Sequence, residues 1–223
     1  SSDVCSSDLM IASQDHKRIF DGDKGPNTGG MGTYAPAPVL TDALRDEAMK
    51  IILEPMVEAM EKEGMPYVGC LYAGLMITDE GPKVVEFNAR FGDPETQVVL
   101  PLLDSDLGEI MMACATGTLT SNMVKWKDSS AACVILASKG YPETSSKGDV
   151  ISGNIKQYDT TIVFHSGTKL VGENYVTNGG RVLGVVGLGK DLRTALDRAY
   201  GRIEHIDFEG MQYRTDIGAK AFK

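Results

Sequence analysis

Apolar and polar side chains alternate along residues 84–95, which is the clearest pattern in the chain. Successive side chains of an extended strand point to opposite faces, so this alternation predicts a strand with one packing face and one polar face. The packing face would carry Val85, Phe87, Ala89 and Phe91, and the polar face would carry Glu86, Asn88 and Arg90. We therefore expect three polar side chains to project together from one strand.

The segment before this strand predicts a helix and a hairpin. Apolar residues return every three or four positions between Thr41 and Glu63, with Thr41 as the cap of a helix and Pro55 as the site of a kink. Residues 67–77 and 83–91 then read as two strands joined by a turn. This hairpin would present the polar face at the surface of a sheet.

Helical signals follow the strand. Asp93 can cap a helix whose first residue is Pro94, and Glu95 complements the positive end of that helix. The helical pattern continues, with a break near Pro101, up to a polar connection at 118–130. The roles of Asp93 and Glu95 at the start of this helix leave two carboxylates beside the end of the strand.

A second strand-rich segment follows the connection. Apolar strands are predicted at 131–138, 161–165 and 181–188, and an amphipathic helix at 192–206. Strands followed by a helix that packs on them make an α+β lobe.

We expect an α+β chain divided into residues 1–9, 10–127 and 128–223. Residues 1–9 repeat Ser-Ser-Asp without a helical or strand period, which predicts a foreign or disordered leader outside the fold.

Residues 13–38 are expected to form a loop, because five glycines and three prolines lie between Gly22 and Pro38. Within it, the backbone N–H groups of residues 25–32 can face an anion, and the glycines permit close approach of a ligand. The alternative is a flexible surface loop. The glycine spacing matches neither a P-loop nor a dinucleotide fingerprint.

Composition excludes several classes of partner. The formal net charge of −9 disfavours nucleic acid and acidic membrane surfaces. No apolar run approaches the roughly 20 residues of a membrane span, and the four cysteines lack the close pairing of a zinc site. A cytoplasmic protein with free thiols and no membrane partner is expected.

The polar face of the 84–95 strand predicts a metal site. Glu86 and Asn88 offer two hard oxygen ligands on one side, the type that Mg²⁺ or Mn²⁺ accepts together with phosphate oxygens and water. Arg90 would lie beside the ion with a fork suited to a phosphate or a carboxylate. The alternative is an ordinary solvated strand face.

A second cation lies in the C-terminal segment. Arg181 follows Gly179 and Gly180 at the start of a predicted strand, where it could reach a phosphate. Lys169, after Gly167 and Thr168, is a similar and weaker candidate. The alternative is a solvated cation after turn glycines, which would give the same sequence pattern.

Several of these motifs together resemble a known family. Ser-Gln-Asp-His-Lys-Arg at 13–18, the glycine-rich run at 25–32, the 86–95 strand, Thr-Asn-Gly-Gly-Arg at 177–181 and Asp-Ile-Gly at 216–218 are similar, in order, to the C-terminal half of glycinamide ribonucleotide synthetases. These are ligases of the ATP-grasp superfamily. The resemblance implies that residues 10–127 form part of an ATP-grasp catalytic domain and 128–223 the family's C-terminal α+β domain.

The resemblance also implies a reaction. Family members join glycine to 5-phosphoribosylamine with ATP, through glycyl phosphate, in the second step of purine synthesis. By this similarity Glu86 and Asn88 bind Mg²⁺ or Mn²⁺, and Arg90 and Asp93 are catalytic. The residues expected to bind substrate are Asn27, Thr28, Gly29, Gly30, Glu95 and Arg181, with Asp15, His16 and Lys17 as weaker candidates.

Two departures from the family pattern limit this prediction. Residues 72–75 lack the acidic metal ligand that many ATP-grasp enzymes carry on the preceding strand, which leaves a second metal open. The N-terminal half of the family's enzyme, with its ATP lid, is absent from these residues, so we expect the isolated chain to be inactive and that half to be its partner. The alternatives are a non-catalytic assembly fragment and another ATP-grasp carboxylate–amine ligase.

Overall fold

The computed structural model describes residues 10–222, whose contacts fall into two compact units. The first unit holds residues 10–12, 37–92 and 103–127, and the second holds 13–36, 93–102 and 128–222. The predicted leader at 1–9 lies outside the described residues. The units differ from the contiguous division predicted at residue 127, because 13–36 and 93–102 pack with the C-terminal segment.

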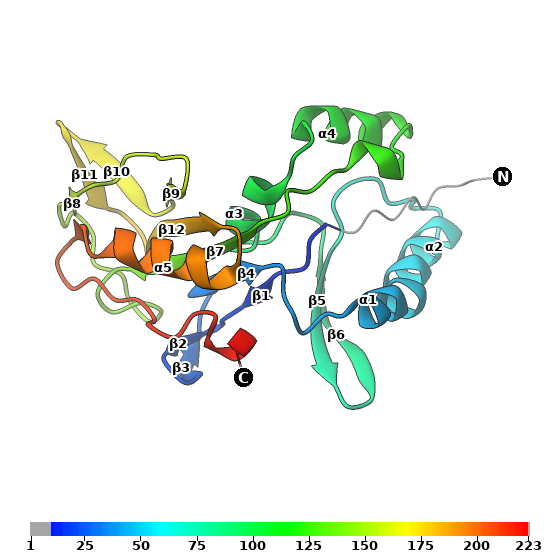
Figure 1. The fold of residues 1–223 in the computed structure, drawn as a ribbon, viewed down its shortest axis with the longest axis horizontal. Helices are drawn as coiled ribbons and strands as arrows, with labels where there is room; N and C mark the ends of the chain where they lie inside the picture. Colours follow the sequence, from blue (N-terminus) through cyan, green and yellow to red (C-terminus); the bar gives the residue numbers. More distant parts are fainter. Residues whose placement is uncertain (1–9, 223) are drawn as a thin grey trace. The chain divides into compact units, whose positions relative to one another are not determined.

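Among its described residues, the first unit contains one hairpin and three α-helices (Figure 1). Strands β5 (Tyr72–Thr78) and β6 (Gly81–Asn88) pair antiparallel, which confirms the predicted hairpin. The helices are α1 (Asp42–Ala48), α2 (Glu54–Lys62) and α4 (Leu107–Thr116). Gly117 ends α4 in the left-handed conformation, since a glycine pays no Cβ penalty there.

The predicted 41–63 helix is confirmed, with an irregularity at its centre. The side chain of Thr41 accepts a hydrogen bond from the Leu44 N–H, as expected of an N-cap. Residues Met49–Leu53 form a π-helical turn that ends two positions before Pro55. Proline has no N–H to continue the α-helical ladder, so the irregularity falls beside it.

The second unit is built on a five-stranded antiparallel sheet in the order β1-β4-β7-β12-β9 (Figure 1). Its strands are β1 (Gln14–Asp15), β4 (Gly32–Ala35), β7 (Ser130–Ala137), β12 (Arg181–Gly189) and β9 (Thr161–His165). Helices α5 (Leu192–Ile203) and α3 (Thr96–Val99) pack on it. The strands predicted at 131–138, 161–165 and 181–188 are therefore confirmed, as is the α+β class.

Three two-stranded antiparallel sheets are also found among the described residues of the second unit. These are β2 (Arg18–Phe20) with β3 (Lys24–Asn27), β10 (Thr168–Val171) with β11 (Asn174–Thr177), and β8 (Ser152–Gly153) with β13 (Ile206–Asp207). The prediction that 13–38 is a loop is wrong, because β1 and β4 extend the central sheet and β4 is wholly buried. None of the helices within residues 10–222 has the length and apolar character needed to cross a bilayer.

Helix α5 approaches β12 closely at Gly187. A Cβ at this position would lie 2.0 Å from the Ala195 carbonyl oxygen and 2.6 Å from the Ala199 nitrogen. Gly187→Ala should therefore lower the free energy of unfolding by about 1–3 kcal/mol, through overpacking. Urea unfolding of the 223-residue chain measures this.

Gly201→Ala, within helix α5, is the matched control for Gly187→Ala on β12. A Cβ at Gly201 would meet nothing within 4 Å, so alanine should be neutral or stabilise the helix by up to about 1 kcal/mol. Equal destabilisation by both substitutions would contradict the proposed packing of α5.

Candidate functional site

Arg181 connects the glycine-rich loop to Asp93 within the second unit. Its Nη1 donates to the Gly29 carbonyl oxygen and to the Asp93 carbonyl oxygen, each at 3.1 Å, and its Nη2 lies 3.0 Å from Asp93 Oδ2. A Cβ on Gly29 would lie 3.0 Å from Arg181 Cζ, so a glycine leaves room for the guanidinium. The structure thus brings together Gly29, Asp93 and Arg181, which the sequence predicts for the site.

The loop is fixed by its own small residues. Thr28 Oγ1 donates to the Lys17 carbonyl oxygen at 2.8 Å and accepts from the Gly30 N–H at 2.9 Å. Gly30 has φ +119°, and a Cβ there would lie 2.8 Å from Asp15 Oδ1. Only glycine adopts this conformation readily, so Gly30 allows the backbone to lie against Asp15. Asn27 ends β3 and is exposed.

Asp15 and Glu95 form an acidic pair beneath this loop. Glu95 is buried, and Asp15 Oδ2 lies 2.6 Å from Lys17 Nζ. Burial raises the pKa of Asp15 to about 6; the hydrogen bond from Lys17 opposes this, and the charge of Glu95 adds to it. Asp15, Lys17 and Glu95 thus place two carboxylates and one ammonium group close together beside the loop.

His16 is buried beside this pair with a lowered pKa. Burial and the charge of Arg214 lower the pKa of the His16 imidazole to about 4. Its Nδ1 lies 3.2 Å from the Gly32 carbonyl oxygen, so the neutral ring donates there. His16 is therefore a neutral packing residue at neutral pH.

Asp15 and His16 make opposite contributions to stability as the pH rises. Between about pH 4 and 6 the folded protein retains a proton on Asp15 that the unfolded chain releases, so folding becomes less favourable with rising pH. Between about pH 4 and 6.5 the unfolded chain holds a proton on His16 that the folded protein does not, so folding becomes more favourable. The two contributions nearly cancel.

Asp15→Asn should remove this cancellation. The free energy of unfolding of the variant should rise with pH by about 1.4 kcal/mol per unit more than the wild type between about pH 4 and 6. Urea unfolding across this range measures the slope. Asp128→Asn, at an exposed position of the same unit, serves as the control. A parallel pH dependence in Asp15→Asn and wild type would refute the raised pKa.

In the first unit, Glu86 and Asn88 lie two residues apart on β6. A bulge separates the pairs Gly74↔Glu86 and Leu75↔Val84, so Val85 is an extra residue without a partner. The predicted uninterrupted alternation is therefore wrong at Val85, which is 66% exposed, and it does not continue to Arg90, because β6 ends at Asn88. The Arg90 side chain is exposed and donates to the Phe91 carbonyl oxygen.

The residues on β6 fit a divalent metal with few protein ligands. Glu86 is exposed, and a Cβ on Gly74 would lie 3.0 Å from its Cγ, so the glycine leaves space for this side chain. Asn88 Nδ2 is buried without a hydrogen-bond partner among the described residues. No cluster of three or more His, Cys, Asp or Glu side chains suited to a metal occurs within residues 10–222. One carboxylate and one amide match a Mg²⁺ whose other ligands are phosphate and water.

The structure corrects the predicted role of Asp93 as a helix cap. Helix α3 starts at Thr96, and its N-cap is Glu95, whose side chain makes no capping hydrogen bond. Asp93 instead accepts from Gln97 Nε2 at 2.9 Å as well as from Arg181. The hydrogen bond from Arg181 is charge-assisted, because both groups are charged.

Tyr141 and Gln97 are neighbours of the site that sequence reasoning missed. The Gly29 N–H donates to the Tyr141 hydroxyl at 3.0 Å, and Gln97 orients the Asp93 carboxylate. No spacing in the sequence marks either residue. A Cβ on Gly180 would lie 2.2 Å from the Tyr141 ring. This close approach becomes apparent only in the folded structure.

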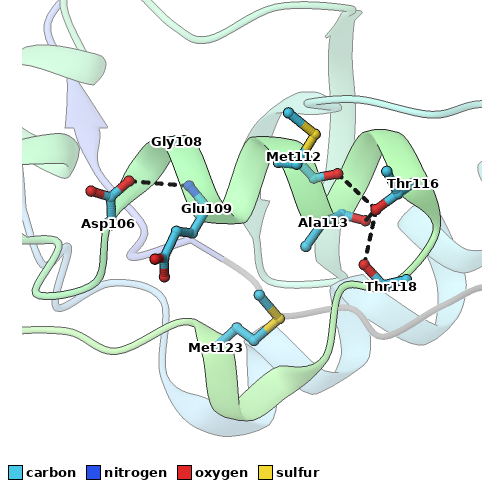
Figure 2. A pocket seen from close by; sticks show the side chains of 8 residues that line it. All are labelled: Asp106, Gly108, Glu109, Met112, Ala113, Thr116, Thr118 and Met123. Atoms are coloured by element: carbon cyan, nitrogen blue, oxygen red, sulfur yellow. Dashed lines mark hydrogen bonds between the residues drawn. The ribbon is translucent and has the colours of Figure 1, made fainter.

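A separate pocket of about 510 Å³ lies along α4 in the first unit (Figure 2). Figure 2 shows the Asp106 carboxylate accepting from the Glu109 N–H, and the Thr116 hydroxyl bonded to Thr118 and to backbone carbonyls. The Asp106 carboxylate therefore caps the N-terminus of α4, and the Thr116 hydroxyl is bonded at its C-terminal end. None of the predicted site residues lines it.

Comparison with solved structures defines the class. A phosphoribosylamine–glycine ligase from Thermotoga maritima superposes with a TM-score of 0.84 at 35% identity, over 94% of this chain and 51% of the other. The biotin carboxylase domain of a Hydrogenobacter thermophilus 2-oxoglutarate carboxylase shares the fold at a TM-score of 0.60 and 13% identity, over 82% of this chain and 40% of the other. The fold is that of an ATP-grasp protein.

Family comparison is more specific. The phosphoribosylglycinamide synthetase ATP-grasp (A) domain matches residues 2–96, and the C domain of the same synthetase matches residues 131–220. The chain belongs to the phosphoribosylglycinamide synthetase family.

Curated relatives agree with this family. Proteins named phosphoribosylamine–glycine ligase from Caulobacter vibrioides and Synechocystis are 53% and 51% identical to it, over 96% and 95% of this chain. A trifunctional purine biosynthetic protein of Gallus gallus is 52% identical over 95% of this chain and 21% of its own length. The chain spans about half the length of the two ligases, 51% in each case.

Proposed function

We propose that this chain supplies about half of an ATP-dependent ligase that joins glycine to 5-phosphoribosylamine. The observation that carries the proposal is the match of two domains of one synthetase family, in order, along this chain. The products would be glycinamide ribonucleotide, ADP and phosphate, and the enzyme would act in the cytoplasm.

The reaction would proceed in two transfers. A glycine carboxylate oxygen takes the γ-phosphoryl group of ATP, giving glycyl phosphate and ADP. The amine of phosphoribosylamine then attacks the acyl carbon, the amide bond forms, and phosphate leaves while the nitrogen loses a proton. The task of the protein is to position these groups and to neutralise the developing charge.

The residues of the first unit would serve the phosphates. We assign Glu86 and Asn88 as ligands of Mg²⁺ or Mn²⁺, which when bound would neutralise charge on the phosphate oxygens. Arg90, whose guanidinium is exposed, would stabilise the transferred phosphoryl group. These assignments agree with the single carboxylate and amide on β6.

The residues of the second unit would hold the substrates. The neighbouring carboxylates of Asp15 and Glu95 would suit an ammonium group, such as that of glycine. Asn27, Thr28, Gly29 and Gly30 would line the site, and Asp93 would orient the loop through Arg181. Arg181 would also offer charge to a substrate phosphate.

A reconstitution tests the proposal. The chain is fused to the part of the Caulobacter vibrioides relative that it does not cover, giving what we call the reconstituted protein, and ADP release is followed by a coupled assay. We expect ADP only when both glycine and phosphoribosylamine are present, and none from the chain alone. Activity of the chain alone would refute the need for a second half. Failure of the reconstituted protein with glycine, but success with another small amino acid, would favour a different ATP-grasp ligase.

A further inference from the structure

Arg214 is a buried cation with every side of its guanidinium engaged. Its side chain is 1% exposed, and its Nε and Nη2 bind the two carboxylate oxygens of Asp216 at 2.7 and 2.8 Å. Its Nη1 lies 3.0 Å from Asp23 Oδ1 and 3.1 Å from the Arg18 carbonyl oxygen. Burial alone would lower the pKa of Arg214, but the hydrogen bonds to Asp216 and Asp23 raise it, so the group stays charged.

The segment 214–220, which contains Arg214, contacts every residue of the turn between β2 and β3, residues 21–23. The Thr215 N–H donates to Asp21 Oδ1 at 2.9 Å, and the Gly22 N–H donates to Asp216 Oδ2 at 2.8 Å. Lys220 Nζ lies 2.6 Å from Asp23 Oδ2. Asp23 has φ +55°, an unusual conformation for a residue with a side chain, so the turn depends on these contacts.

The other side of the segment is fixed to helix α5. The Tyr200 hydroxyl donates to the Arg214 carbonyl oxygen at 3.0 Å and accepts from the Ile217 N–H at 3.1 Å. Helix α5 packs on β7 and β12, the central strands of the sheet. The turn between β2 and β3 is therefore tied to the helix that packs on the central strands of the second unit.

This turn leads directly into the glycine-rich loop. Arg18 in β2 pairs with Asn27 in β3, and the Arg18 Nη1 donates to the Gly25 carbonyl oxygen at 2.6 Å. Thr28, the next residue, is held through the Lys17 carbonyl oxygen. A displacement of the turn would thus be transmitted to residues 28–30.

We propose that Arg214 is a positioning residue, which holds the β2–β3 hairpin so that the loop at 27–30 is presented to the substrate. The proposal rests on the function proposed above for that loop. Arg214 acts through Asp23, Asp216 and the Arg18 carbonyl, and it does not itself touch the reacting groups. Its loss should therefore weaken substrate binding more than it slows the chemical step.

Arg202 provides a matched control for a merely structural arginine. It is also buried in the second unit, at 8% exposure, and its Nη2 donates to Asn154 Oδ1 and to the Lys156 carbonyl oxygen. None of these partners belongs to the β2–β3 hairpin. Arg214→Met and Arg202→Met should both lower stability, but only the first should loosen the loop.

Hydrogen exchange of the 223-residue chain tests the anchoring without any activity. In Arg214→Met, peptides covering residues 18–31 should exchange at least about tenfold faster than in wild type, under conditions where the protein stays folded. Arg202→Met should leave the exchange rates of these peptides at the wild-type values. Arg214→Lys should give rates between those of wild type and Arg214→Met. The same exchange in the two methionine variants would overturn the anchoring.

Kinetics of the reconstituted protein test the consequence. Arg214→Met should raise KM for phosphoribosylamine or glycine about tenfold and change kcat far less, with partial rescue by lysine. Faster exchange with an unchanged KM would overturn the positioning role. A wild-type reconstituted protein without ligase activity would refute the proposed function instead, and the exchange comparison would still decide whether Arg214 anchors the loop.

Discussion

Glu86→Gln should lower kcat of the reconstituted protein by about 10²–10³-fold, because the substitution removes the only carboxylate proposed to bind the metal beside the transferred phosphoryl group. The glutamine keeps the size of the side chain and the register of β6 opposite Gly74. Mn²⁺ binding, followed by electron paramagnetic resonance, should weaken in parallel. This second measurement separates loss of the metal from a general loss of activity.

Glu80→Gln is the control for Glu86. Glu80 lies in the turn of the same hairpin, is 82% exposed on its side chain, and pairs with Lys83 at 3.2 Å. Exposed pairs of this kind contribute little to stability, so this variant should keep wild-type kcat and Mn²⁺ affinity. Equal effects of the two substitutions, or wild-type metal binding in Glu86→Gln, would contradict the assignment of Glu86.

Arg181→Met should raise KM for phosphoribosylamine by about 30-fold, which corresponds to about 2 kcal/mol. The substitution breaks the bonds from the guanidinium to Gly29 and Asp93, so the loop loses its attachment to the segment that follows β6. Steady-state kinetics of the reconstituted protein measures the change. The effects of Arg181→Met and Asp93→Asn should not add, because the two residues form one pair.

Lys190→Met is the matched control for Arg181. Lys190 is an exposed cation that follows the other end of β12. It should leave KM unchanged, because no site residue is bonded to it among the described contacts. Additive effects of the Arg181 and Asp93 substitutions, or an equal rise in KM for Lys190→Met, would refute the pairing as the basis of substrate binding.

The long elements could be predicted because their patterns are local. Strands β7, β9 and β12 are continuous apolar runs, and α5 has a clear apolar stripe, so periodicity alone locates them. Strand β4 was missed because it lies among glycines that resemble a loop. At Gly32 a Cβ would lie 2.6 Å from the Cys133 carbonyl oxygen, so this glycine serves the close pairing of strands rather than flexibility.

The site was predictable only in part, for a similar reason. The metal ligands proposed on β6 are two residues apart, and a strand places such residues on one face. Arg181 and Asp93 are 88 residues apart, and only the folded sheet brings them together. Asp93 was instead predicted to cap a helix from its neighbour Pro94, since local capping is the simpler explanation when the tertiary partner is unknown.

Oxygen transfer from labelled glycine tests the central claim, that this chain belongs to an enzyme that activates the glycine carboxylate with ATP. The reconstituted protein is supplied with ATP, phosphoribosylamine and glycine whose carboxylate carries ¹⁸O, and the released phosphate is analysed by mass spectrometry. Each phosphate should contain one ¹⁸O atom, because the carboxylate oxygen that takes the phosphoryl group leaves with it. Phosphate without ¹⁸O, released while product forms, would contradict the account.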